Sequence, residues 1–436
     1  MSYSFRGGIH PEPHKRETSC AAIETLPPPD EVVIPMSMHI GVPCEPIVKV
    51  GDYVRLGQKI GDSSAFVSAP IHASVSGAVK RIAMTLHPSG SQSMAVFIEN
   101  DGKDELYDLE PQDDWESMSA DALTGFVREA GIVGHGGAAF PTQVKIRSAI
   151  GKVDTLIING AECEPYISSD HRCMLENTKE IVGGAKILLK MFPEASCLIA
   201  IESNKPDAIE AISKAIEKDS RMQVATLKTK YPQGSEKQLI KSVTGREVPP
   251  GALPVNAGCL VLNVETTAAI YRAIVQGRPV VRRVVTVAGS AVAQPKNLKV
   301  RVGTPLKYLI EAAGGFIEEP QKIIMGGPMM GLSQFSLDVP VIKGTNALLA
   351  FAANEDRRVE EPKCIRCGRC VQVCPMRLLP TYMYLYASKD NYEECDRLHV
   401  NDCMECGACT FECPGSLHLT QMFRVAKGKV MERRKK

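Results

Sequence analysis

Nine of the 15 cysteines in this 436-residue chain lie in one short segment, between Cys364 and Cys413. The segment contains two copies of the spacing C-x2-C-x2-C-x3-C-P, one ending at Pro375 and the other at Pro414. An exported protein stabilised by disulfides would distribute its cysteines through the domains that they join. The N-terminal sequence also lacks the apolar core of a signal peptide. Two complete copies are not expected by chance, and the clustered thiols indicate a metal site.

The repeated spacing is that of bacterial ferredoxins, in which each run binds one [4Fe–4S] cluster and lends its last cysteine to the other. Three thiolates separated by two residues wrap around one cluster in a tight turn. The fourth thiolate, one residue further on and followed by proline, points away. We therefore assign two ligand sets: Cys364, Cys367, Cys370 and Cys413 for one cluster, and Cys403, Cys406, Cys409 and Cys374 for the other. Zinc is the alternative, but zinc modules favour two C-x2-C pairs.

Two further expectations concern the same segment. Cys395 matches neither run, so we expect an ordinary buried thiol. Apolar residues recur at helical spacing from Leu378 to Tyr386, which predicts a helix between the runs. Two clusters that share their ligand runs must lie close together, and this suits one-electron relay rather than substrate chemistry.

The N-terminal hundred residues divide into two parts. Residues 1–30 are polar and rich in proline, and we expect an irregular arm. Residues 31–100 alternate short apolar runs with turn signals, which predicts an all-β sandwich. Its two halves resemble those of lipoyl and biotinyl carriers. The hairpin from Asp62 to Phe66 lacks the lysine that such carriers modify, so we expect a structural or docking module.

An α/β pattern follows an acidic linker at residues 101–119 and covers residues 120–280. Strands and helices alternate here, which implies a parallel sheet with right-handed crossovers. The expected strands are residues 154–159, 195–202 and 222–228, and the expected helices are residues 177–191 and 206–219.

Residues 281–350 predict a small mixed sheet with β-grasp-like packing. Its strands are expected at 284–288, 298–302 and 322–325, around a helix that Thr304-Pro305 begins and Gly314-Gly315 ends. Residues 351–425 hold the cysteine module. The basic end, residues 426–436, is expected to be a frayed, solvated tail or to contact an acidic partner or an anionic membrane surface. The fold class is thus an α/β multidomain protein.

Charge and composition exclude several classes of protein. Lys and Arg total 51 against 50 Asp and Glu, so the chain lacks the field of positive charge that nucleic-acid binding requires. Apolar residues make up 44% and charged residues 23%, which is typical of globular proteins and not of disordered ones. No uninterrupted apolar run approaches the roughly 18 residues of a membrane span. The cytoplasm is the default location, and docking on a membrane complex stays open.

A glycine-rich loop, Gly134-His135-Gly136-Gly137, precedes an expected helix over residues 143–150 that contains Lys145. Glycine lets backbone N–H groups approach an anion, and the helix N-terminus favours negative charge. The loop does not follow a clear strand, so it is not the usual dinucleotide fingerprint. Polar segments at residues 159–165, 231–236 and 263–266 are candidates for the same site. Turn capping or surface charge is the plainer explanation for each segment alone, but it explains the three together less well.

The chain resembles the RnfC component of the Rnf electron-transport complex over nearly its whole length. The resemblance is carried by FRGGIHPEPHK, APIHASVSG, GHGGAAFPTQVK, INGAECEP, YPQGSEKQLI, LNVET, GGPMMG and both ferredoxin runs. The central part also resembles the flavin-carrying, NADH-oxidising subunit of respiratory NADH dehydrogenase, which has GRGGAGFPTGLK, NADEGEP, YICGEET and NNVET segments. This implies a Rossmann-like flavin and NADH domain over residues 120–280 and a ligand-binding (SLBB-like) β-grasp domain over residues 281–350.

The resemblance also implies roles for single residues. Those that would cradle the phosphate and ring of FMN are Gly134, Gly136, Gly137 and Lys145. Those that would line the flavin cavity are Asn159, Glu162, Tyr231, Gly234, Glu236, Asn263 and Thr266. Phe140 would stack on NAD(H), and Glu164 would hydrogen-bond the nucleotide. The departures from the dehydrogenase pattern are His135 for Arg, Ala139 for Gly, Ala161 for Asp, Ser235 for Glu and Leu262 for Asn.

The function implied is that of an NADH-linked oxidoreductase subunit in a membrane-bound, ion-translocating complex. Electrons would pass between NAD(H), FMN and the two clusters, because a flavin converts between two-electron and one-electron transfer. The subunit would lie peripherally on the cytoplasmic face of the membrane, with other Rnf-type subunits, including a ferredoxin-like one, as partners. Two alternatives stay open: a cobalamin reductase of the propanediol-utilisation type, and a non-enzymatic electron-carrying scaffold, which the losses at Ala161 and Ser235 motivate.

Overall fold

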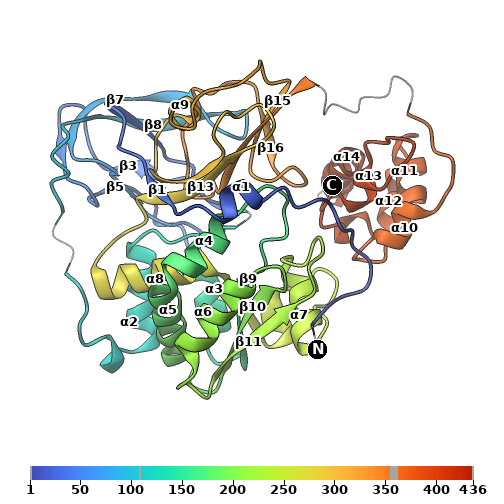
Figure 1. Ribbon diagram of the computed structural model, residues 1–436, viewed down its shortest axis with the longest axis horizontal. Coiled ribbons are helices and arrows are strands. Elements are labelled where there is room, and N and C mark those ends of the chain that lie inside the picture. The colour runs from blue at the N-terminus through green and yellow to red at the C-terminus, as the bar shows by residue number, and fades with distance from the viewer. Residues whose placement is uncertain (1, 108–109, 137, 354–361, 435–436) are drawn as a thin grey trace.

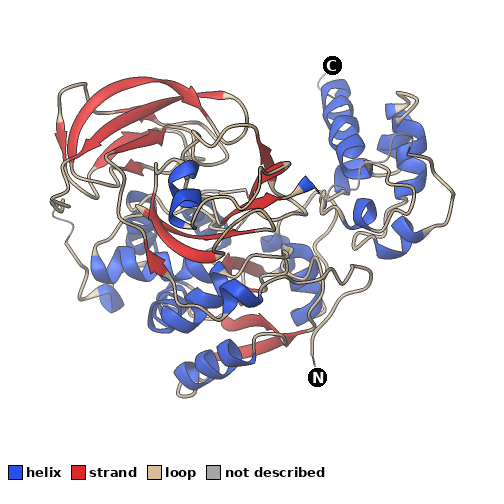
Figure 2. Cartoon of the chain, turned by 45° about the horizontal axis from the view of Figure 1, so that its top comes forward, coloured by secondary structure: helices blue, strands red, loops and turns tan. Residues whose placement is uncertain are grey.

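The computed structural model describes residues 2–107, 110–136, 138–353 and 362–434. Figure 1 shows four parts: a β-sandwich and a β-grasp domain packed side by side, an α/β domain beneath them, and a helical cysteine domain to one side. Figure 2 colours the chain by secondary structure: the cysteine domain is helical, and strands predominate in the β-sandwich. In the part of the chain that is described, no helix has the length and apolar character needed to cross a bilayer.

The β-sandwich consists of two antiparallel sheets. The larger has the order β2-β8-β7-β4 and the smaller the order β3-β5-β6. Their strands are β2 (Glu31–Pro35), β3 (Glu45–Pro46), β4 (Tyr53–Val54), β5 (Lys59–Asp62), β6 (Ile71–His72), β7 (Gly77–Leu86) and β8 (Gln92–Asn100). The side chains of Val32, Ile34 and Ile60 are fully buried between the sheets. The sandwich predicted for this segment is confirmed.

The hairpin at which lipoyl carriers present their lysine contacts the α/β domain here. Arg128 Nη2 donates to Asp62 Oδ1 at 2.8 Å and to the carbonyl of Ser63 at 2.9 Å. Gln143 Nε2 donates to the carbonyl of Phe66 at 2.9 Å. The hairpin therefore holds the sandwich against the α/β domain, and the structural or docking role expected from the sequence stays a prediction.

The α/β domain is built on four parallel strands in the order β11-β10-β9-β12. The strands are β9 (Thr155–Gly160), β10 (Ser196–Glu202), β11 (Met222–Leu227) and β12 (Cys259–Asn263). The helices are α2 (Ala120–Glu129), α3 (Thr142–Ala149), α4 (Ser169–Glu176), α5 (Thr178–Met191), α6 (Pro206–Ile216), α7 (Glu236–Thr244) and α8 (Val264–Gln276). Leu156 and Ile158 face one core and Ile157 the opposite one, so helices cover both faces.

The strand order reverses next to β9, because β10 and β11 follow on one side and β12 lies on the other. Open parallel sheets bind ligands at the carboxyl ends of the strands, where such a reversal leaves a crevice. The parallel sheet predicted from the sequence is confirmed. A ligand site is expected at the carboxyl ends of β9 and β12.

The β-grasp domain contains a six-stranded mixed sheet in the order β1-β14-β13-β17-β15-β16. Its elements are β1 (Glu24–Thr25) from the N-terminal arm, β13 (Arg282–Ala288), β14 (Lys296–Arg301), α9 (Leu306–Ala312), β15 (Lys322–Met325), β16 (Leu332–Gln334) and β17 (Ala347–Phe351). Lys343, fully buried, joins this domain to two others: its Nζ donates to the carbonyls of Pro70 at 2.6 Å and Gly131 at 2.7 Å.

The N-terminal arm is less irregular than expected. It contains the short helix α1 (Arg16–Ser19) and the strand β1 (Glu24–Thr25), which pairs in parallel with β14 as the edge of the β-grasp sheet. In Figure 1 its dark-blue trace runs from the α/β domain to the cysteine domain and back to α1. The contacts that hold the arm are with residues far away in the sequence, which composition alone does not reveal.

The cysteine domain is helical, with α10 (Arg369–Val373), α11 (Pro380–Ala387), α12 (Tyr392–Arg397), α13 (Ala408–Phe411) and α14 (Leu419–Arg434). Helix α11 confirms the predicted helix between the runs, and Cys395 is fully buried as expected. The expectation of a frayed tail was wrong, since residues 426–434 continue α14. Val430 is buried there, and Arg434 Nη2 lies 2.6 Å from Asp396 Oδ1. Residues 435 and 436 of the expected tail lie outside the described residues.

Candidate functional site

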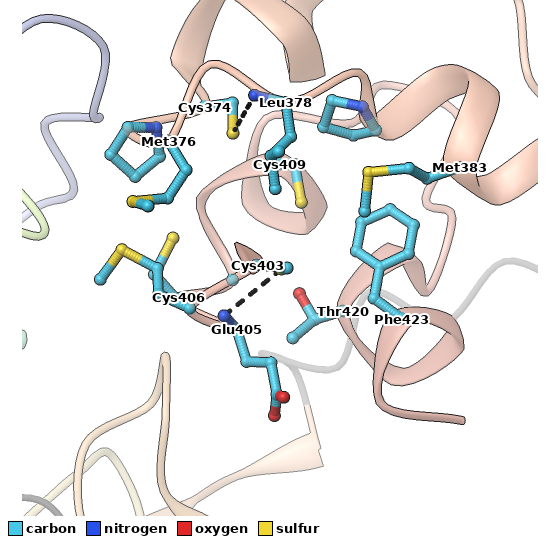
Figure 3. A pocket seen from close by; sticks show the side chains of 14 residues that line it. Cys374, Met376, Leu378, Met383, Cys403, Glu405, Cys406, Cys409, Thr420 and Phe423 are labelled. Atoms are coloured by element: carbon cyan, nitrogen blue, oxygen red, sulfur yellow. Dashed lines mark hydrogen bonds between the residues drawn. The ribbon is translucent and has the colours of Figure 1, made fainter. Parts of the chain in front are cut away.

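Two spaces of similar size in the cysteine domain are each surrounded by four thiols. One is lined by Cys374, Cys403, Cys406 and Cys409, here called the inner set. The other is lined by Cys364, Cys367, Cys370 and Cys413, here called the outer set. Figure 3 shows the inner set, with cysteines of both runs facing one space. These are the two groups that the spacing of the runs defines.

The two runs have the same backbone geometry, which shows that they form one repeated unit. Left-handed residues recur at matching positions: Arg366 (φ 56°) and Gly368 (φ 77°) in the first run, Glu405 (φ 58°) and Gly407 (φ 78°) in the second. These positive φ angles turn the chain tightly between the first three cysteines. Each run thereby folds around its own space, while its last cysteine reaches the other.

The donor set of the inner space suits an iron–sulfur cluster. Its lining is otherwise mostly apolar, with Met383 and Phe423 among the wall residues. Burial raises the pKa of the Cys406 and Cys409 thiols to about 12, and a bound metal ion is what converts such thiols to thiolates. Among the described residues, no three metal-ligating side chains converge on a single point. The thiols instead surround a space, and soft thiolates are the ligands that iron–sulfur clusters use.

Backbone N–H groups also point at the sulfurs. Glu405 N donates to Cys403 Sγ at 3.4 Å, and Leu378 N donates to Cys374 Sγ at 3.3 Å. Hydrogen bonds to cluster sulfurs and burial are the means by which a protein sets a cluster's reduction potential. The inner set has both. In the outer set, Cys364 and Cys367 are exposed.

A second group of candidate residues meets at the carboxyl ends of β9 and β12. Asn159 and Asn263 are register partners on these strands. Asn159 Nδ2 donates to the carbonyl of Gly234 at 2.9 Å. Asn263 Nδ2 donates to Asp170 Oδ2 at 2.6 Å, and its Oδ1 caps α8. Two amides and a glycine turn are therefore held together at the strand ends, where the strand order predicts a crevice.

The glycine-rich loop lies against the carboxyl end of β12 and the start of α8. A Cβ added to Gly136 would lie 3.4 Å from Asn263 Nδ2, and the N–H of His135 donates to Thr266 Oγ1 at 3.0 Å. Gly134 N closes the loop on the carbonyl of Phe140 at 2.9 Å. Gly137, also expected in the cradle, lies outside the described residues.

A paired lysine lies near the same strand ends. Lys145 extends from α3, and its ammonium contacts Glu236 and lies 3.5 Å from the carbonyl of Val261. The structure thus brings together Gly134, Gly136, Lys145, Asn159, Gly234, Glu236, Asn263 and Thr266 from the residues expected to hold FMN. A lysine beside a glycine-rich loop and two amides is a donor set that fits a phosphorylated ligand.

Several buried polar atoms around the loop have no hydrogen-bond partner within the described residues. They include both ring nitrogens of His135, which is 2% exposed, Thr142 Oγ1 and Arg283 Nη1. Arg283 comes from the β-grasp domain, and its Nη2 donates to the carbonyl of His135 at 3.1 Å. Burial and this arginine hold the pKa of His135 well below its usual value, so the imidazole is neutral. The guanidinium of Arg283 therefore lies next to the loop. In the dehydrogenase pattern an arginine stands in the loop itself, at the position of His135.

Three expected site residues use their side chains in other contacts. Glu162 caps α4, accepting from the N–H groups of Asp170 at 2.7 Å and His171 at 3.2 Å. Glu164 accepts from the N–H groups of Met329 at 3.1 Å and Met330 at 3.0 Å.

Burial raises the pKa of Glu164 to about 7. The third of these residues is Tyr231, whose Oη donates to the carbonyl of Cys406 at 2.6 Å. Phe140 is half-buried in the loop. The structure therefore does not place Glu162, Glu164 and Tyr231 with free side chains in the crevice.

The roles of two polar residues at the site could not be predicted from the sequence. Asp170 accepts from Asn263, and burial together with Glu162 raises the pKa of Asp170 to about 7. Gln238 Nε2 donates to the carbonyl of Pro375 at 3.0 Å, which links the α/β domain to the inner set. Asp170 lies outside the recognised motifs, and Gln238 lies inside YPQGSEKQLI but was given no role, because its contact joins segments far apart in the chain.

Four family profiles match the chain in succession. They are described as the RnfC barrel sandwich hybrid domain (residues 3–103), the Nuo51 FMN-binding domain (127–272), the SLBB domain (284–333) and the 4Fe-4S dicluster domain (357–414). The fold class expected from the sequence, including its lipoyl-like, flavin, β-grasp and two-cluster parts, is confirmed. So are the expected cofactors, FMN and two [4Fe–4S] clusters.

Curated relatives align with almost the whole chain, and each is the C component of its complex. That of the proton-translocating ferredoxin:NAD(+) oxidoreductase complex of Clostridium ljungdahlii is 48% identical over 396 residues, covering 90% of this chain and 86% of the relative. That of the Na(+)-translocating ferredoxin:NAD(+) oxidoreductase complex of Acetobacterium woodii is 46% identical over 435 residues, covering 99% and 98%. That of the ion-translocating oxidoreductase complex of Rhodobacter capsulatus is 43% identical over 437 residues, covering 99% and 84%. At this identity and coverage, the chain belongs to the RnfC family.

Proposed function

We propose that this chain is the RnfC-type electron-transfer component of a membrane-bound, ion-translocating NAD:ferredoxin oxidoreductase complex. It passes electrons between NAD(H), FMN and two [4Fe–4S] clusters, and its partners are the other subunits, including a ferredoxin-like one. We place it peripherally on the cytoplasmic face of the membrane. The observation that carries the proposal is the direct contact between a four-thiol set and the domain that holds the candidate flavin crevice.

The two cysteine sets are not equivalent in position, and this suggests an order of electron transfer. The inner set contacts the α/β domain through Tyr231 and Gln238. The outer set includes the exposed Cys364 and Cys367. We propose that the inner cluster exchanges electrons with the flavin and that the outer cluster exchanges them with a partner subunit.

The residues at the crevice have separable roles. When bound, FMN supplies the conversion between the two-electron chemistry of NAD(H) and the one-electron chemistry of a cluster. Gly134 and Gly136 leave backbone free to approach its phosphate, and Lys145 supplies positive charge there. Asn159 and Asn263 supply amide groups at the strand ends. Glu162 and Tyr231 act through others, by fixing α4 and the inner cysteine run.

The proposal is tested on anaerobically purified full-length protein loaded with iron, sulfide and FMN. We expect about eight irons per chain, from two four-iron clusters, and one FMN. NADH should bleach the flavin and then the cluster absorbance. Flavin that stays oxidised in NADH would favour the electron-carrying scaffold instead. Corrinoid reduction by the isolated chain would favour a cobalamin reductase.

The ligand assignment is tested by pairing alanine substitutions within and across the two runs. Under the proposed sets, Cys364→Ala combined with Cys413→Ala removes one cluster and leaves about four irons. Cys403→Ala combined with Cys413→Ala removes a ligand from each set and leaves about none. The opposite result, with more iron kept by the second pair, would show that each run binds its own cluster.

A further inference from the structure

The first residues of the arm extend the sheet of the α/β domain. Tyr3 N donates to the carbonyl of Thr226 at 2.9 Å, and Lys228 N donates to the carbonyl of Tyr3 at 2.8 Å. Tyr3 thus pairs with the free edge of β11. The backbone of this stretch is held on the domain that contains the flavin crevice.

The next residues of the arm contact the inner cysteine run. Gly8 N donates to the carbonyl of Val373, the residue before Cys374, at 2.8 Å. Ile9 exchanges two backbone hydrogen bonds with Tyr231, at 2.8 and 2.9 Å. The side chain of Tyr231 in turn donates to the carbonyl of Cys406. The arm is therefore hydrogen-bonded to the run that contains Cys374 and to Tyr231. Tyr231 in turn is hydrogen-bonded to the run that contains Cys406.

Two adjacent glycines make this approach sterically feasible. Gly7 (φ +83°) and Gly8 (φ +80°) both have left-handed backbones. A Cβ at Gly7 would lie 2.8 Å from the carbonyl oxygen of Cys374, and one at Gly8 would lie 2.6 Å from that of Tyr231. Both neighbours are backbone atoms, which cannot rotate away as a side chain can. Glycine is required here because the chain passes against a cysteine of the inner set.

The far end of the arm is anchored as well. Tyr166 N donates to the carbonyl of Pro13 at 2.8 Å, and the ring of His14 stacks on Tyr166 at 4.7 Å. The Lys15 ammonium contacts the carbonyl of Glu162. Residues 3–15, here called the strap, are thus fixed to the α/β domain at both ends and cross the inner cysteine run between them.

We propose that the strap is a positioning element for electron transfer: it holds the inner cluster at a fixed separation from the flavin crevice. This rests on the function proposed above. Electron transfer between two centres slows as they separate, so an element that fixes their separation also fixes the rate of transfer. Gly7 and Gly8 are positioning residues in this sense, since they contact the ligand run and not the flavin.

The test uses the full chain loaded with iron and FMN, in which NADH is mixed anaerobically and flavin and cluster bleaching are followed separately. In Gly7→Ala and Gly8→Ala we expect wild-type flavin bleaching, unchanged iron and FMN content, and cluster bleaching slowed severalfold. The matched control is Gly51→Ala. Gly51 has a similar left-handed backbone (φ +94°), but a Cβ there would meet no atom within 4 Å, so its cluster kinetics should match wild type.

A milder variant covers the case in which the alanines reduce iron loading. Tyr3→Pro removes the N–H that donates to Thr226 and leaves both glycines in place. We expect it to keep its iron and to slow cluster bleaching by a smaller factor. Wild-type cluster kinetics in an iron-loaded Gly7→Ala, Gly8→Ala or Tyr3→Pro protein would overturn the positioning role. Clusters that NADH fails to reduce even in the wild-type protein would instead refute the proposed function.

Discussion

Replacing Lys343 with methionine should change how the stability of this protein depends on pH. The Lys343 ammonium is buried where the β-grasp domain, the β-sandwich and the α/β domain meet, and it donates to one carbonyl from each neighbour. Burial lowers its pKa from 10.5 to about 7. Between these two values the unfolded chain holds a proton that the folded chain has released.

The size of the effect follows from that difference in proton binding. Stability rises with pH wherever the unfolded state binds more protons, by up to about 1.4 kcal/mol per pH unit for one group. Raising the pH from 7.5 to 9.5 should therefore stabilise the wild-type protein through this lysine by about 2.5 kcal/mol. Below the folded pKa both states are protonated, so the lysine contributes no slope there. Lys343→Met removes the titrating group and this increment with it.

The assay is urea unfolding of metal-free protein in reductant, followed by the fluorescence of Trp115, the one tryptophan of the chain. We compare the free energy of unfolding at the two pH values for wild type, Lys343→Met and Lys322→Met, which replaces an exposed lysine of the same domain. Other titrating groups act equally in all three and cancel in the comparison. Equal pH increments in wild type and Lys343→Met would show that this amine is not neutral at pH 9.5, and would refute the reasoning.

Two further substitutions test the packing of the α/β domain. Gly184→Ala would place a Cβ 2.0 Å from the carbonyl oxygen of Thr267, so we expect thermal unfolding to show destabilisation by at least about 1–3 kcal/mol. In Gly125→Ala the new Cβ meets no atom within 4 Å on helix α2, and a gain of about 0.5–1 kcal/mol is expected. A similar effect of both would contradict the packing. Arg272→Met leaves the carboxylate of Glu265, which is 3% exposed, without its main partner. Calorimetry should show a loss of about 3–5 kcal/mol, and a loss below about 1 kcal/mol would exclude a strong buried pair.

The sheet at the centre of the molecule was predictable because its signal is local. Buried parallel strands consist of nearly continuous apolar residues, and β9 and β10 begin and end within one residue of the expected ranges. Helix α4 was not predicted, because its sequence is polar and its N-terminus is capped by Glu162 from outside the helix. A cap supplied by a side chain from the preceding strand end cannot be recognised from residues next to the helix.

The part of the candidate site that could be predicted consists of residues that belong to a recognisable motif and make their contacts at that motif. The cysteine spacing defined both thiol sets, and the loop residue Gly136 lies beside Asn263 at the crevice. The sequence could not show that Tyr231 contacts the cysteine domain, because a motif does not say which distant carbonyl its hydroxyl reaches. The end of the chain was misjudged for the same reason, since tertiary contacts on α14 outweigh its density of basic residues.

The exchange of the fourth thiol between the two runs bears on how the protein is made. The ribosome delivers Cys364, Cys367 and Cys370 long before Cys413. Under the proposed ligation, the outer cluster lacks its full ligand set until residue 413 has been synthesised. The inner cluster lacks its full ligand set until residue 409 has been synthesised. The two therefore become competent to receive iron almost simultaneously, although Cys364, Cys367 and Cys370 of the outer set precede Cys403, Cys406 and Cys409 of the inner set by 39 residues. Both inorganic centres are then inserted into a cysteine segment whose two runs have already been synthesised together.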